Sequence, residues 1–196
     1  MKKFLLTLLV AVTVLASAAQ VKDSDPQLIQ RLNKYMQLSK DLKFDQLMDY
    51  TYPALFKIAP KEAILQSFEQ AYNNEEMQIV IDSIAIQSIG PDFRQQEARF
   101  KKIDYFMSIR LRYKDTALLA DADFKNRMLK GLEGGFPGKT INYNDKDHSF
   151  AVAGTEMMFA IKEAPVAAWM FIGYNKNPEL IKALFPQAVI DHFKLL

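Results

Sequence analysis

The sequence has no cysteine among its 196 residues. This absence excludes disulfide bonds, cysteine-based catalysis, thiolate metal sites and lipid attachment at a cysteine. A chain of this length can still bury enough apolar surface to fold on a hydrophobic core alone. We therefore expect a single domain that is stabilised by its core.

Histidine is also scarce, and the two that occur are His148 and His192. Neither lies in an H-E-x-x-H pattern, and no third ligand is evident beside either one, so the sequence predicts no metal site. The G-x-S-x-G motif that marks many serine hydrolases does not occur either. Nothing in the sequence predicts a cofactor.

The first residues have the pattern of a secretory signal peptide. Lys2 and Lys3 precede an apolar run over residues 4–15, and the small residues Ala16-Ser17-Ala18 follow it. The run is shorter than the roughly 20 residues of a membrane-spanning helix. We predict a signal peptide over residues 1–18 with cleavage near residue 18 or 19, a flexible leader over 19–25 and one domain over 26–196. The mature protein is expected in the periplasm or outside a bacterial cell, without a stable membrane anchor.

The chain has no excess of positive or negative charge once that segment is removed. Lys2 and Lys3 are two of the 25 basic residues, so the remaining chain carries 23 basic and 23 acidic residues. A neutral chain has no global field to attract nucleic acid or an anionic membrane, so neither is expected as a partner.

Residues 103–113 are organised as a β-strand with strict alternation. Apolar residues and tyrosines share one face, and mostly polar residues share the other. The first face consists of Ile103, Tyr105, Met107, Ile109, Leu111 and Tyr113, and the second of Asp104, Phe106, Ser108, Arg110 and Arg112. This pattern predicts an antiparallel sheet that is covered on one face.

Helices are predicted before the strands. Asp25-Pro26 gives an N-cap and a proline at the first helical position, and a helical apolar stripe continues to Leu42. A short helix is expected over residues 44–50. A third is expected over residues 60–73, with an inner side of Ile64, Leu65, Phe68, Ala71 and Tyr72.

Further strands follow the helices. The strand over residues 77–89 changes register near Asp82-Ser83, which predicts a β-bulge. A strand over 149–162 is apolar on both faces and is expected at the centre of the sheet. Other strands are predicted over 139–143 and 166–174. A helix capped by Asp121 is inserted among the strands, and short helices begin near Asn177 and Pro186. The fold class is therefore α+β, with N-terminal helices packed on a bent, mostly antiparallel sheet.

This order of elements resembles the nuclear transport factor two-like (cystatin-like) superfamily. The resemblance rests on residues 40–47 and on Tyr50-Thr51-Tyr52-Pro53, Pro60-Lys61-Glu62 and Trp169-Met170-Phe171-Ile172-Gly173. The stretch Leu180-Ile181-Lys182-Ala183-Leu184-Phe185-Pro186 is similar to the C-terminus of uncharacterised secreted bacterial members. The resemblance implies a cone-shaped α+β fold. Members include isomerases, dehydratases and binding modules, so the fold alone does not fix the function.

A candidate ligand pocket follows from that cone. Its predicted lining is Tyr35, Tyr50, Tyr52, Tyr105, Glu156 and Trp169. In the isomerase branch a tyrosine and a carboxyl group act on a carbonyl, and here only Tyr50 or Tyr52 with Asp104 or Glu156 could do so. Asp104 shares its strand face with arginines, whereas Glu156 lies among apolar neighbours. The competing interpretation is that the tyrosines only pack in the core.

A second candidate surface is the polar face of residues 103–113. Phe106, Arg110 and Arg112 on this face form either a contact for an acidic partner or a surface glycan, or an ordinary hydrated sheet face. An exposed Phe106 would favour an interface, including one between two copies of the chain. We expect a secreted, non-catalytic binding module for an unknown small apolar molecule or protein. The alternative is an isomerase- or dehydratase-like enzyme.

Overall fold

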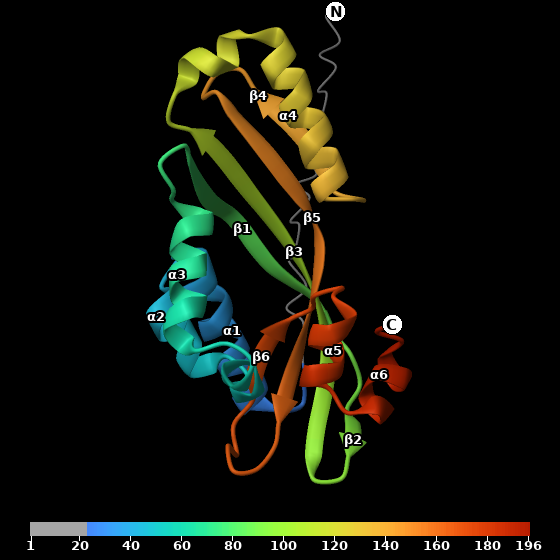
Figure 1. Ribbon diagram of the computed structural model, residues 1–196. Coiled ribbons are helices and arrows are strands. Elements are labelled where there is room, and N and C mark those ends of the chain that lie inside the picture. The colour runs from blue at the N-terminus through green and yellow to red at the C-terminus, as the bar shows by residue number, and fades with distance from the viewer. Residues whose placement is uncertain (1–22) are drawn as a thin grey trace, which may run out of the picture.

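The computed structural model describes residues 23–196. The predicted signal peptide and most of the predicted leader lie outside the described residues. The described part has the predicted α+β architecture: helices, then a curved, unclosed antiparallel sheet with one inserted helix, then two short helices. Figure 1 shows the long strands of the sheet at the centre, with helices grouped around both of its ends.

The N-terminal helices begin where the sequence predicts. Asp25 caps the first helix, and its side chain accepts the backbone N–H groups of Gln27 and Leu28. The predicted second helix is an α-turn that tightens into a 3₁₀ turn. The elements are α1 (Pro26–Lys40), α2 (Phe44–Leu47), η1 (Met48–Tyr50), η2 (Pro53–Lys57) and α3 (Lys61–Tyr72). Among residues 23–196, no helix is long and apolar enough to cross a membrane.

Six strands form the sheet. They are β1 (Met77–Ile89), β2 (Phe93–Gln95), β3 (Ala98–Tyr113), β4 (Thr140–Asn144), β5 (Ser149–Lys162) and β6 (Met170–Gly173). The order is β1-β3-β5-β4, while β2 pairs with the start of β3 and β6 with the end of β5. The predicted central position of β5 is confirmed, because it pairs with β3, β4 and β6.

Two predictions about strand irregularities have different outcomes. The register of β1 against β3 shifts between Ile81 and Ser83, as predicted, and again between Ile86 and Ser88, which was not predicted. The last strand is shorter than predicted and begins only at Met170. The carbonyl oxygen of Trp169 accepts a hydrogen bond of 2.6 Å from Arg31 Nε, so at this residue it bonds to a helix side chain instead of a neighbouring strand.

The two ends of the β3–β5 ribbon are covered differently. We call the end near Phe100 and Ile161 the β6 end, and the end near Leu111 and Phe150 the β4 end. At the β6 end, α1 packs on the face that carries Ile103, and the C-terminal helices pack on the opposite face. At the β4 end, α4 packs on the Ile103 side only. The helices involved are η3 (Thr116–Ala120), α4 (Ala122–Gly135), α5 (Pro178–Leu184) and α6 (Gln187–Phe193).

Candidate functional site

An apolar chamber of about 280 Å³ lies between the helices α1–α3 and strand β6. Its lining is mostly aliphatic and aromatic: Tyr35, Leu47, Met48, Thr51, Leu55, Ile64, Phe68, Ile172, Gly173, Tyr174, Asn175 and Leu180. Helix α3 contributes Ile64 and Phe68, yet none of its residues is fully buried. The inner side of α3 therefore packs in part against buried Leu47 and Met48 and in part borders this space.

Three tyrosine hydroxyls gather on the helix-covered face of the sheet. Burial raises the pKa of Tyr35 to about 12, and the nearby Tyr72 adds to this shift. Burial, followed by the nearby Tyr35 and Glu156, raises the pKa of Tyr105 above its ordinary value. All three phenols therefore stay protonated at neutral pH and remain hydrogen-bond donors.

These hydroxyls have unused hydrogen-bonding capacity. No hydrogen bond joins the hydroxyl of Tyr35, Tyr72 or Tyr105 to another residue of 23–196, and no fully buried side-chain oxygen in that range lacks a partner. The hydroxyls are thus not sealed in the core. Tyr35 also lines the chamber, so the apolar space adjoins the group of three tyrosine hydroxyls.

Glu156 is the cross-strand neighbour of Tyr105. Its Oε1 lies 2.7 Å from Lys139 Nζ, and the same ammonium group donates to the carbonyl oxygen of Thr155. Lys139 crosses the sheet over Gly154, where any Cβ would collide with the lysine stem. The Glu156 side chain is 35% exposed, so it is a paired and partly hydrated carboxylate.

The ion pair stands at a gap in the edge of β5. Strand β4 pairs with β5 only as far as Ala153, and β6 begins to pair at Met158. A more open cleft of about 730 Å³ lies over this gap and is lined by Lys139, Glu156 and Tyr174 among others. Because Tyr174 also lines the chamber, the two spaces are neighbours.

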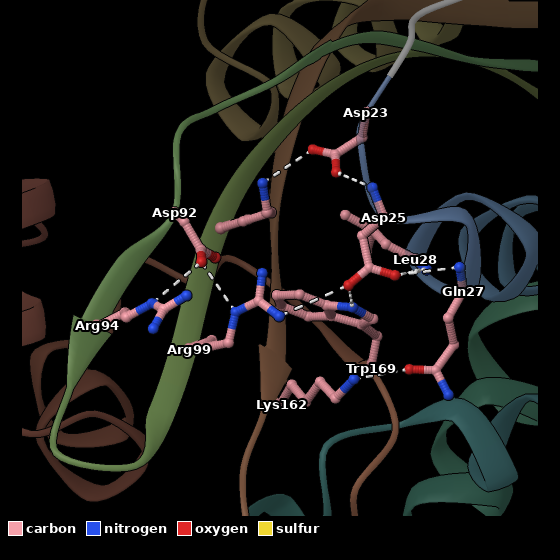
Figure 2. A network of polar contacts seen from close by, with 10 residues as sticks. Asp23, Asp25, Gln27, Leu28, Asp92, Arg94, Arg99, Lys162 and Trp169 are labelled. Atoms are coloured by element: carbon pink, nitrogen blue, oxygen red, sulfur yellow. Dashed lines mark hydrogen bonds and ion pairs between the residues drawn. The ribbon is translucent and has the colours of Figure 1, made fainter.

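A charged network fixes the start of α1, the helix that carries Tyr35. The Trp169 indole Nε1 donates to Asp25 Oδ2 at 2.8 Å, and the Arg99 guanidinium lies 4.9 Å from the centre of the Trp169 ring (Figure 2). Lys162 Nζ donates to Gln27 Oε1 at 2.9 Å. The helix is therefore held at a fixed position over the sheet.

The same network contains a buried ion pair. Lys101 Nζ lies 2.8 Å from Asp23 Oδ2, and each side chain is 8% exposed. Partial burial raises the pKa of Asp23, but the hydrogen bonds from Lys101 and from the backbone N–H of Asp25 outweigh it, so the pKa lies below its ordinary value. This pair ties the chain just before α1 to strand β3.

The six predicted pocket residues do not line one pocket. Tyr35, Tyr105 and Glu156 come close to one another, as described above. Trp169 is fully buried in the core. The Tyr50 ring lies under the Arg31 guanidinium, 4.5 Å away, and the Tyr52 hydroxyl donates to Glu163. Neither Tyr50 nor Tyr52 is hydrogen-bonded to Glu156, so the predicted enzymatic pair is not assembled here.

The side chains of the candidate partner face are mostly half-buried or already paired within the chain. Phe106 is half-buried, and only Arg112 of the three predicted residues is exposed. Arg110 donates from Nε to Asp82 Oδ2 at 3.0 Å and from Nη1 to Asp147 Oδ2 at 2.9 Å. Its charge is already matched by two carboxylates, which weakens the case for an acidic partner.

Sequence reasoning missed Lys139 and the hydroxyl of Tyr72 as parts of the site. Tyr72 was predicted on the inner side of its helix, which was a usable signal. Lys139 gives no such signal, because its contact with Glu156 depends on the gap in the β5 edge.

Comparison with models of known protein families gives no match to this chain. Comparison with curated proteins gives no significant match either. Among the described residues, no group of three acidic or histidine side chains is arranged to hold a metal ion.

Proposed function

We propose that this protein is a secreted or periplasmic, non-catalytic binding module that holds a small ligand in the chamber. The observation that carries the proposal is the half-buried inner side of α3 around a space of about 280 Å³. Ligand pockets are mostly apolar cavities with a few convergent polar groups, and their volumes begin at about 300 Å³. The chamber has this apolar composition, and its volume of about 280 Å³ lies at the lower limit, which suits a compact ligand.

The polar groups beside the chamber indicate an amphipathic ligand. Its apolar body would occupy the chamber. Its polar end would meet the hydroxyls of Tyr35, Tyr72 and Tyr105, with Lys139 and Glu156 beyond them. Membership of the nuclear transport factor two-like superfamily is part of the same proposal, and the order of helices and strands supports it.

The test uses 1-octanol as an amphipathic probe and follows backbone amide shifts by NMR. We expect saturable shifts at Ile64, Phe68 and Gly173, which line the chamber. Gly173→Leu should weaken binding at least about tenfold, because the new side chain fills the space that the probe needs. A Cβ at Gly173 meets no atom within 4 Å, so the substitution does not strain the backbone by collision.

Gly131→Leu is the matched control. Gly131 is exposed on α4, and a Cβ there also meets no atom within 4 Å. This variant should bind 1-octanol as the wild type does. Equal affinity in the two leucine variants, or shifts scattered outside the chamber, would contradict the proposal.

A further inference from the structure

A second pocket, of about 320 Å³, lies on another side of η2. Leu55 of η2 lines the chamber, whereas Ala54 and Lys57 of the same turn line this second pocket. Its other walls come from the end of β5 and from the connection between β5 and β6. The lining residues that a ligand could contact include Tyr52, Ala54, Glu163, Val166 and Met170.

Two polar groups in this pocket are held in fixed positions. The backbone N–H of Tyr52 donates to the carbonyl oxygen of Phe171 at 2.8 Å, and the Tyr52 side chain is buried. Its hydroxyl donates to Glu163 Oε1 at 2.9 Å. Glu163 directly follows the last residue of the central strand β5. The tyrosine and the carboxylate are therefore anchored independently and meet at the pocket wall.

The carboxylate retains unused acceptor capacity. Burial, and then the hydrogen bond to Glu163, raise the pKa of Tyr52 above its ordinary value, so the phenol remains a donor to Glu163. An ionised carboxylate offers about four acceptor positions, and Tyr52 takes one. No ion pair among residues 23–196 includes Glu163. A half-buried carboxylate beside apolar walls therefore lacks a cation from the described chain.

We propose that this pocket binds a small organic ammonium ion with a compact apolar body. The ammonium group would donate to Glu163, and the apolar body would pack between Ala54, Val166 and Met170. Charge-assisted hydrogen bonds are stronger than neutral ones, and partial exclusion of water strengthens them further. The exposed Lys57 at the rim would oppose a simple amine but would attract an acidic group at the far end of a zwitterion.

The test uses benzylammonium chloride as the probe, with benzyl alcohol as its neutral analogue. Titration is followed by backbone amide NMR of the full chain. We expect benzylammonium to shift the amides of Tyr52, Ala54, Glu163 and Val166 in a saturable manner, and benzyl alcohol to bind at least about tenfold more weakly. Glu163→Gln should lower benzylammonium affinity by a similar factor. Glutamine still accepts the Tyr52 hydroxyl, so the fold should be kept.

Glu179→Gln is the matched control, because Glu179 is an exposed carboxylate on α5. It should leave benzylammonium affinity unchanged. Lys57→Gln should tighten benzylammonium binding, because it removes a positive charge at the rim. If the same variant binds the zwitterion 4-(aminomethyl)benzoate more weakly than the wild type does, zwitterions are the preferred class of ligand. Equal benzylammonium affinity in wild type and Glu163→Gln, or no shift at the four pocket amides, would overturn the proposal. The chamber variant Gly173→Leu should not alter this binding, so the two proposals can fail separately.

Discussion

The β6 end and the β4 end of the sheet share the same two central strands but have different surroundings. At the β6 end, helices cover both faces, and the fully buried rings of Phe100, Phe159 and Phe171 lie there, whereas Phe150 is the fully buried ring of the β4 end in the described part of the chain. At the β4 end, α4 covers one face, and the opposite face carries half-exposed polar side chains. The chamber and the second pocket are both lined by residues of the β6 end.

The most buried ion pair of residues 23–196 also lies at the β6 end, although the Arg99 pairs there are about as exposed as the Arg110 pairs. The Lys101–Asp23 pair at the β6 end has side chains that are each 8% exposed. The Arg110–Asp147 pair at the β4 end has side chains that are 29% and 30% exposed. Charges that lose their water must be paired closely, whereas partly hydrated charges tolerate the loss of a partner. The most deeply buried ion pair, and the two pockets proposed above to bind ligands, therefore lie at the doubly covered end.

The largest effect should come from removing a buried aromatic side chain at the β6 end. Phe159→Ala should lower the free energy of unfolding by about 3–5 kcal/mol, because Phe159 is fully buried and its loss leaves a cavity. Phe106→Ala, on the face of the sheet opposite α4, should lower the free energy of unfolding by about 1 kcal/mol or less, since Phe106 is only half-buried. Urea denaturation measures both. Equal losses of unfolding free energy would show that the face opposite α4 is as tightly packed as the β6 end.

A smaller effect should appear in the pH dependence of stability. The pKa of Asp23 in the folded protein lies below the ordinary value of 3.8, so its contribution is complete above about pH 5 and is lost as the pH falls through the unfolded and then the folded pKa. Asp23→Asn should therefore flatten the fall in unfolding free energy between pH 5 and pH 2, measured as a series of urea titrations at roughly half-unit pH steps.

Asp147→Asn is the comparison for the β4 end. The hydrogen bond from Ser149 is the largest cause that lowers the pKa of Asp147; desolvation opposes it, and the hydrogen bond from Arg110 lowers the pKa further. The sign is therefore the same as for Asp23. Because the Asp147 side chain is more exposed, we expect a smaller change of slope. A larger change than for Asp23→Asn would contradict the proposed difference between the two ends.

Much of the fold follows from local sequence patterns. The alternation over residues 103–113, the proline and aspartate at the start of α1, and the register change near Asp82 each depend on neighbouring residues. Such patterns directly determine which face a side chain occupies. The three-residue strand β2 was missed, since so short a segment shows no periodicity.

The sites were harder to predict because they depend on distant contacts. Tyr52 and Glu163 are 111 positions apart, and Arg110 and Asp82 are 28 apart. No spacing rule joins such residues before the strand register is known. The sequence identified Tyr35, Tyr105 and Glu156 as pocket candidates, but it could not indicate that Tyr52 is bonded to a different carboxylate.

Native mass spectrometry of the protein purified from its own host tests the central claim most directly. We predict a bound small molecule that is lost on denaturation, absent from Gly173→Leu and retained by Gly131→Leu. A protein that carries no small molecule, or one whose bound mass is the same in both variants, would contradict a ligand-binding chamber beneath α3.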